Sequence, residues 1–141
     1  MIARALSKLD SYIHDEGLRG FDPYDSLASP LFQLPGIRSL RPIRLSAQQI
    51  LRRLPLNVRP LLGIPKGYNP VTLGLCLQAY SVRAGTPGSA KQLLEERGAH
   101  CLSELNRLRS PGYRGASWGY DFDWEGRYAS LPAWTPTVVA T

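Results

Sequence analysis

The chain has 141 residues, 43% of them hydrophobic, and its 17 Lys and Arg against 11 Asp and Glu give a net charge of +6. This length is typical of one domain, and no window approaches the roughly 18 consecutive apolar residues of a transmembrane helix. Charges near the start argue against a secretory signal, so we expect a cytoplasmic protein without a membrane span.

The first segment has the period of an amphipathic helix. Apolar residues recur at spacings of three and four from Ile2 to Glu16, and we expect the helix to end near Gly17. The next segment, 20–30, is dense in turn formers but also aromatic, which is atypical of a flexible linker. It predicts an ordered, irregular loop.

A short helix is predicted from Leu45 to Leu54, with Ser46 as its cap and Pro55 as its stop. Residues 56–69 follow, with prolines and glycines between apolar residues. Because this composition is too apolar for disorder, we expect an extended connector across the domain.

Two longer helices are predicted next. Asn69 can cap a helix that runs to about Val82, and this helix is apolar almost all round, so we expect it to be deeply buried. An amphipathic helix over residues 89–108 would form an αα-hairpin with it. Cys76 and Cys101 fall in these helices without any ligand spacing, so we expect two buried thiols, no metal site, no disulfide framework and no cofactor.

The positive charge is unevenly distributed. No acidic residue occurs between Asp25 and Glu95, whereas nine Lys and Arg do. One interpretation is a basic surface for an anionic partner. The other is a general preference for arginine, since Arg outnumbers Lys 14 to 3 over the whole chain. No nucleic-acid-binding motif accompanies the charge, and no nucleic-acid partner is expected.

The C-terminal region contains the most unusual segment, in which aromatic residues alternate with carboxylates from Trp118 to Arg127. Aromatic faces stack on sugar rings, carboxylates bind hydroxyl groups or act as acid and base, and an arginine can hold an anionic group. Strict alternation is also the period of a half-buried strand. In that interpretation the aromatics belong to the core and the acids face solvent.

Three motifs resemble the N-terminal part of bacterial α/α-toroid proteins associated with capsule and exopolysaccharide biosynthesis. The motifs are Gly20-Phe-Asp-Pro-Tyr-Asp-Ser-Leu-Ala-Ser-Pro30, Arg59-Pro-Leu-Leu-Gly-Ile-Pro-Lys-Gly-Tyr-Asn-Pro70, and Trp118-Gly-Tyr-Asp-Phe-Asp-Trp-Glu-Gly-Arg127 followed by Thr135-Pro-Thr-Val-Val-Ala-Thr141. The wider architecture includes six-hairpin glycosidases and terpenoid cyclases. The resemblance implies an all-α fold: helical hairpins of an incomplete α/α toroid, with long ordered loops around a central cavity. Residues 1–141 would then be one domain, the N-terminal fragment of a larger toroid.

The resemblance also implies a carbohydrate-active protein, or one associated with polysaccharide biosynthesis, and leaves open whether this chain is an enzyme. Asp123 is the candidate catalytic acid or hydroxyl ligand. The candidate substrate-binding residues are Trp118 and Trp124 as stacking platforms, Arg127 as a clamp for an anionic sugar, and Asp22, Tyr24 and Asp25 from the first loop. Asp121 and Glu125 stand where the family commonly has amides, which makes both poor candidates for catalysis.

The alternative is a non-catalytic scaffold or assembly protein that holds an anionic polymer or a partner against its basic middle region. It predicts that Arg38, Arg41, Arg44, Arg52 and Arg53 cluster on one exposed face. An isolated fragment of a toroid would also leave helix faces uncovered, so we expect it to self-associate.

Overall fold

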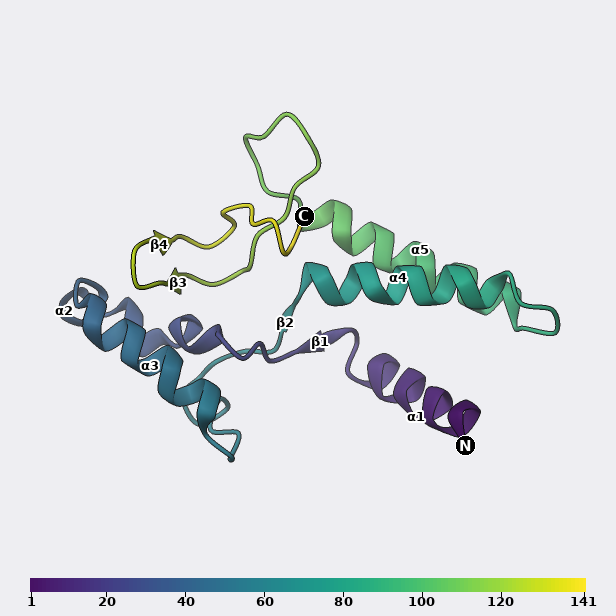
Figure 1. Cartoon of the computed structure of the whole chain (residues 1–141), viewed down its shortest axis with the longest axis horizontal. Coiled ribbons are helices and arrows are strands. Elements are labelled where there is room, and N and C mark those ends of the chain that lie inside the picture. Colours follow the sequence, from purple (N-terminus) through teal and green to yellow (C-terminus); the bar gives the residue numbers. More distant parts are fainter.

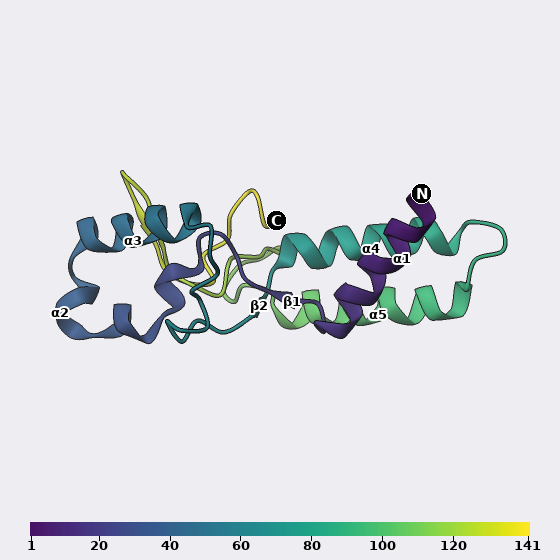
Figure 2. The same cartoon turned by 90° about the horizontal axis from the view of Figure 1, so that it is seen from below.

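A computed structural model describes all residues from 1 to 141. The chain is mostly helical, with five α-helices, two 3-10 turns and two small antiparallel ribbons. Figures 1 and 2 show an elongated molecule with α2 and α3 at one end, α1, α4 and α5 at the other, and irregular segments between them. The expected predominance of helix is therefore confirmed. None of the helices is long and apolar enough to cross a membrane.

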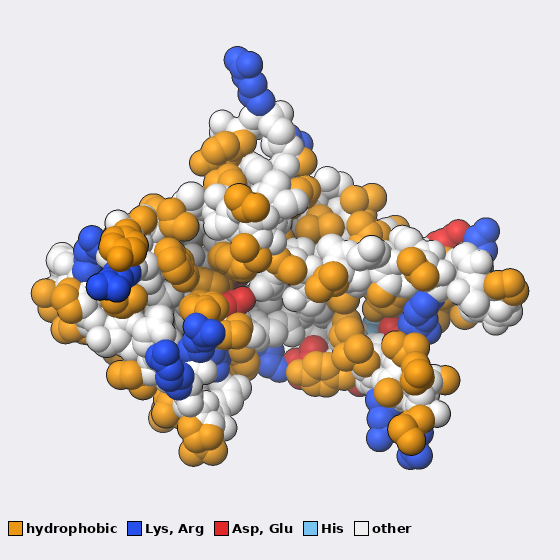
Figure 3. Space-filling view, viewed as in Figure 1, with side chains coloured by type: hydrophobic (Ala, Val, Ile, Leu, Met, Phe, Trp, Pro, Cys, Tyr) orange, Lys and Arg blue, Asp and Glu red, His pale blue; other side chains and the backbone are white.

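Helix α1 (Ile2–Asp15) has the predicted bounds to within a residue, and Gly17 follows it with a φ of 59°. No residue of α1 is buried and most of its apolar side chains are exposed, among them Leu9 and Tyr12, whereas Ile13 packs against the core between α4 and α5. Asp10 attaches the helix to its neighbours, with Oδ1 2.6 Å from Arg97 Nη1 and Oδ2 3.4 Å from Arg83 Nη1. Figure 3 shows hydrophobic side chains over this part of the surface.

Helices α4 (Pro70–Ala84) and α5 (Lys91–Arg107) form the predicted hairpin. The Asn69 side chain caps α4 by accepting a hydrogen bond from Val71 N at 2.9 Å, as expected. The main apolar cluster lies between the two helices and includes both free cysteines. It comprises Leu73, Cys76, Tyr80, Leu94, Cys101 and Leu108. The predicted burial of the thiols is confirmed.

The expectation that α4 is deeply buried is wrong for half of its surface. Leu75 is 62% exposed and Val82 is 68% exposed. The reason is geometric: α5 packs along one side of α4, and one neighbouring helix cannot cover a helix that is apolar all round.

The other end of the molecule contains η1 (Asp25–Ala28), η2 (Pro30–Gln33), α2 (Pro35–Arg38) and α3 (Arg41–Arg53). Helix α3 begins four residues before the predicted start, so Ser46 lies inside it and is not its cap. Pro42 occupies the first turn, where its missing N–H costs no hydrogen bond. The first loop is ordered, as expected, but η1 and η2 take up much of it.

Two ribbons connect distant segments. Strand β1 (Arg19–Gly20) pairs with β2 (Gly67–Tyr68), which ties the start of the first loop to the connector. Strand β3 (Trp124–Glu125) pairs with β4 (Ser130–Leu131). The alternation of aromatic and acidic residues in the C-terminal region therefore produces only the two-residue strand β3.

Candidate functional site

The first loop and the C-terminal region, almost a hundred residues apart, are joined by one buried side chain of α3. Gln48 is 1% exposed. Its Nε2 donates to Tyr24 O at 3.1 Å, and its Oε1 accepts from Glu125 N at 2.9 Å. One amide thus satisfies a backbone acceptor of the first loop and a backbone donor of β3, and it fixes the two segments relative to each other.

An ion-pair network reinforces this junction. Arg44 Nε lies 3.1 Å from Glu125 Oε2, and Arg44 Nη2 lies 3.3 Å from Asp123 Oδ2. Arg41 Nε adds a second pair to Glu125 at 2.8 Å. Burial raises the pKa of the Glu125 carboxyl, but the Ser130 hydroxyl and the guanidinium groups of Arg41 and Arg44 outweigh it, and the pKa lies below its usual value. Glu125 is therefore a structural anion.

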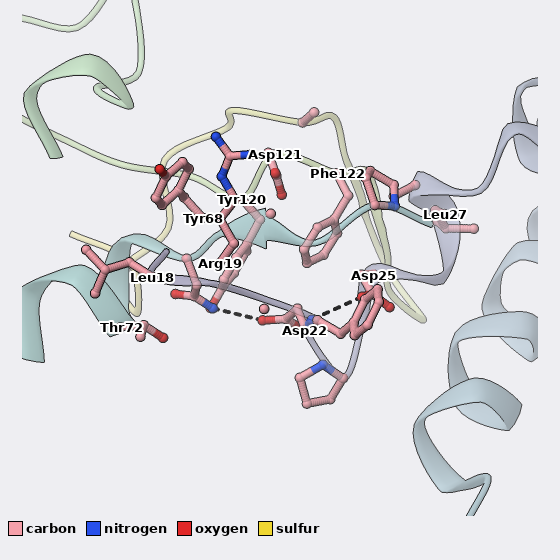
Figure 4. Close-up of a pocket in the computed structure, with 18 of the residues that line it drawn as sticks. Leu18, Arg19, Asp22, Asp25, Leu27, Tyr68, Thr72, Tyr120, Asp121 and Phe122 are labelled. Atoms are coloured by element: carbon pink, nitrogen blue, oxygen red, sulfur yellow. Dashed lines mark hydrogen bonds between the residues drawn. The ribbon is translucent and has the colours of Figure 1, made fainter. Parts of the chain in front are cut away.

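Next to this junction an open cavity of about 530 Å³ lies between β1, β2 and residues 120–123. Figure 4 shows its labelled side chains converging from these segments. Tyr120 and Phe122 contribute stacked rings with centroids 5.3 Å apart and planes 19° apart. Tyr68 adds a third ring, with the Arg19 guanidinium 4.8 Å from its centroid. The cavity thus has both aromatic faces and polar groups, as small-molecule sites do.

Asp121 reaches this cavity from the C-terminal region and rests against Gly67 of β2. A Cβ at position 67 would overlap its carboxylate, so only glycine leaves room for it there. Asp121 takes part in no ion pair and in no hydrogen bond with another side chain. Burial of the carboxyl and the nearby charge of Asp22 raise its pKa, although the residue as a whole is exposed to solvent. Such a carboxyl has the chemistry of a general acid.

The two predicted acids of the first loop are engaged in the fold. Asp22 Oδ1 accepts from Tyr24 N and its Oδ2 from Asn69 Nδ2, each at 2.9 Å. Asp25 is buried, with Oδ1 2.7 Å from Arg59 Nε. Burial raises the pKa of Asp25 more than the Arg59 guanidinium lowers it. Both carboxylates line the cavity while they also hold the loop in shape.

Asp123, the candidate catalytic residue, lines the same cavity as Asp22 and Asp25, so the predicted convergence of the two segments is present. Both of its oxygens already accept hydrogen bonds, one from Arg44 Nη2 at 3.3 Å and the other from Ala133 N at 3.0 Å. Of the cavity's carboxylates, Asp121 has fewer partners than Asp123. Sequence reasoning had discounted Asp121, and no periodicity could reveal its contact with Gly67.

Two other predicted residues, Tyr24 and Trp124, line a smaller cavity of about 360 Å³. Asp22, Tyr120 and Phe122 border both cavities, so the two spaces share a wall. The guanidinium of Arg52 covers the Tyr24 ring at 4.8 Å. Tyr24 and Trp124 are thus near the main cavity but do not line it.

Trp118 and Arg127 lie outside both cavities. The Trp118 indole N–H donates to Leu105 O at 2.7 Å, and the ring packs against the cluster between α4 and α5. Arg127 is exposed, with its guanidinium 5.5 Å from the centroid of the Tyr128 ring. The expected platform of Trp118 and the expected clamp of Arg127 are therefore not part of the arrangement that contains Asp22, Asp25 and Asp123.

Much of the basic middle region is matched by acids of this chain. Arg41, Arg44 and Arg59 pair with Glu125, Asp123 and Asp25. The absence of acids between Asp25 and Glu95 thus reflects partners supplied from the first loop and the C-terminal region. Arg38, Arg52 and Arg53 stay exposed at the α2–α3 end, where Figure 3 shows Lys and Arg side chains. The predicted five-arginine face is not formed, because Arg44 is buried.

Comparisons of the chain with protein-family models, curated proteins and solved structures found no match.

Proposed function

We propose that this chain binds a carbohydrate in the 530 Å³ cavity, as part of an α/α-toroid protein of polysaccharide biosynthesis or modification. The observation that supports this function best is the combination of stacked Tyr120 and Phe122 rings with the carboxylate of Asp121 in one cavity. Sugars present exactly these two kinds of surface, apolar C–H faces and hydroxyl groups, to a protein.

The size of the cavity supports the proposal. Ligand pockets commonly span about 300–1,000 Å³, and a volume of about 530 Å³ falls inside that range. Asn69 and Thr72 add polar groups to the lining, and the Asn69 amide donates to Asp22 Oδ2 at 2.9 Å. The ligand would therefore meet hydrogen-bonding groups on more than one side.

The roles differ from those expected from the motifs. Tyr120 would provide the stacking surface, supported by the buried Phe122 ring on which it stacks, and Asp121 would bind hydroxyl groups. Asp22, Asp25 and Asp123 would shape the site, because their oxygens already accept hydrogen bonds from the protein. Trp124 and Tyr24 would support the shared wall from the smaller cavity.

The scaffold alternative has less support. Buried ion pairs of Arg44 and Arg59 neutralise part of the charge that an anionic polymer would need. Arg38, Arg52 and Arg53 remain, and three exposed cations at one end of the molecule are a common feature of basic proteins.

A glycan array tests the proposal, followed by calorimetry of each bound oligosaccharide with wild type, Tyr120→Ala and Asp121→Asn. Loss of a stacking ring costs about 1 kcal/mol or more, so we expect affinity to fall at least about fivefold in Tyr120→Ala.

Tyr128→Ala is the matched control, since Tyr128 is 88% exposed and lines neither cavity. It should bind like wild type. Equal affinities for wild type, Tyr120→Ala and Asp121→Asn, with unchanged unfolding curves, would remove this cavity as the sugar site. The absence of any bound glycan would reject the function.

A further inference from the structure

We infer that the cavity selects a sugar with a protonated amino group, a hexosamine unit, over neutral and acidic sugars. The inference rests on the proposed carbohydrate function and names its substrate class. It differs from the anionic sugar that Arg127 suggested, and it follows from the aromatic walls of the cavity together with the balance of charge around them.

The lining of the cavity is acidic. It contains five carboxylates and a single basic residue, Arg19. Three of the carboxylates are neutralised by cations from outside the lining, through the pairs Glu16 with Lys66, Asp25 with Arg59, and Asp123 with Arg44. Asp22 and Asp121 remain, and neither forms an ion pair with any Lys, Arg or His of the chain.

The remaining cations near the cavity are already committed. The Arg19 guanidinium lies over the Tyr68 ring, 4.8 Å from its centroid, and Arg107, which lies over the same ring at 5.4 Å, pairs with Glu104. Arg59 reaches Asp22 only at its backbone carbonyl, through Nη2 at 3.0 Å, while its Nε serves Asp25. A cationic ligand would therefore complete the charge balance of the cavity, and an anionic ligand would worsen it.

The excess of negative charge in the cavity acts mainly on the carboxyl group of Asp121. Burial raises the pKa of its carboxyl, and repulsion from Asp22 raises it further. An ammonium group near both carboxylates offsets their repulsion, because it restores an opposite charge, and it also donates hydrogen bonds to the Asp121 oxygens. A neutral hydroxyl can donate a hydrogen bond but cannot remove the repulsion.

The aromatic walls favour an organic cation over a bare metal ion. The Tyr120 ring, which stacks on the buried Phe122 ring, attracts an ammonium group or polarised C–H bonds. Both oxygens of Asp22 already accept hydrogen bonds from Tyr24 N and Asn69 Nδ2, which leaves the Asp121 carboxylate as the main free ligand. Calcium requires about six to eight oxygen ligands, far more than this site offers.

The test uses four trisaccharides with one β-1,4-linked backbone: glucosamine, N-acetylglucosamine, glucose and glucuronate. Calorimetry with wild type at about pH 6, where the amine is charged, gives the ranking. We expect the glucosamine trimer to bind about tenfold tighter than the glucose trimer, since one charge-assisted hydrogen bond gives about that factor. The N-acetylated trimer, without the charge, should lose that advantage, and the glucuronate trimer should bind weakest.

Asp121→Asn should remove the preference for the amine, because the neutral amide cannot offset the charge of the ammonium group. Asp15→Asn makes the same change in net charge on the exposed side of α1 and should retain the preference. Equal affinities for the amino and neutral trimers, or a preference that persists in Asp121→Asn, would overturn the inference and leave the proposed function intact. If none of the four trimers and no glycan on the array binds, both fail.

Discussion

Arg44 of α3 and Glu125 of β3, 81 positions apart in the sequence, form an ion pair in which both side chains are almost completely buried (8% and 2% exposed). The pair lies next to Gln48, which bridges the first loop and the C-terminal region. The first loop and the C-terminal region bound the cavity. Its shape therefore depends on Arg44, Gln48 and Glu125, although none of these three residues lines it. Helix α3 is thus the support of the candidate site.

Arg44→Met should destabilise the fold, because it leaves the buried Glu125 and Asp123 with fewer partners. Breaking a buried ion pair costs about 3–5 kcal/mol, and Arg41 keeps part of the compensation, so we expect about 3 kcal/mol from urea unfolding. The control is Arg53→Met. Arg53 lies on the same helix and donates hydrogen bonds only to Gln49, so its replacement should change the free energy of unfolding by less than about 0.5 kcal/mol. Equal urea midpoints for the two variants would contradict a structural role for the pair.

The lowered pKa of Glu125 predicts a loss of stability in acid. In the folded protein the carboxylate persists below its ordinary value of 4.5, so the unfolded chain takes up the proton first as the pH falls. Its contribution is present above that value and disappears as the pH falls through the folded pKa. The difference in unfolding free energy between wild type and Glu125→Gln should therefore be largest near neutral pH and should shrink in acid.

The contribution of Asp25 to stability should change with pH in the opposite direction to that of Glu125. Burial raises the pKa of its carboxyl above the ordinary 3.8, so protonation favours the folded state. Its contribution is present below 3.8 and is lost as the pH rises through the folded pKa. Wild type should accordingly gain stability relative to Asp25→Asn as the pH falls, measured by the same urea titrations. Parallel pH profiles for the Glu125 and Asp25 variants would contradict the two assignments.

Two glycines with different surroundings give a paired stability test. A Cβ at Gly119 would lie 2.7 Å from the carbonyl carbons of Trp134 and Thr135, and backbone atoms cannot move aside easily. Gly119→Ala should therefore cost about 2 kcal/mol, as other overpacked sites do. Gly74 lies inside α4 with open space around it, so Gly74→Ala should add up to about 1 kcal/mol through helix propensity. Thermal unfolding should shift in opposite directions, and shifts of the same sign would refute the close packing at Gly119.

The parts of the fold that the sequence predicted well are those fixed by local signals. The period of α1, the Asn69 cap of α4 and the turn between α4 and α5 each depend on residues a few positions apart. The start of α3 was missed because Pro42 opens the helix without a side-chain cap, and Ser46 offered a stronger but false signal. The exposure of Leu75 was missed because apolar composition does not reveal how many neighbours a helix has.

For the candidate site, the sequence predicted which segments meet but assigned the wrong neighbours to several residues. Alternation placed Trp118 beside Tyr120 and Phe122, whereas the indole N–H is bonded to Leu105 O in the helical core. The excess of arginine in the middle region had two interpretations, and the ion pairs of Arg44 and Arg59 explain much of it within the chain. Such long-range pairings leave no periodic signal, so only the structure could assign them.

The contact between Gly67 and Asp121 allows the site to be altered without removing any side chain. A methyl group at position 67 would overlap the Asp121 carboxylate, and the carboxylate, as the end of a flexible side chain, can swing out toward solvent. Gly67→Ala should therefore change the free energy of unfolding by less than about 1 kcal/mol, since β2 has an ordinary strand conformation. It should nevertheless weaken binding of the glucosamine trimer about as much as Asp121→Asn does. Gly115→Ala, in the C-terminal region outside both cavities and with open space around it, is the matched control and should bind like wild type. Normal binding by Gly67→Ala would mean that the Asp121 carboxylate does not act from this position.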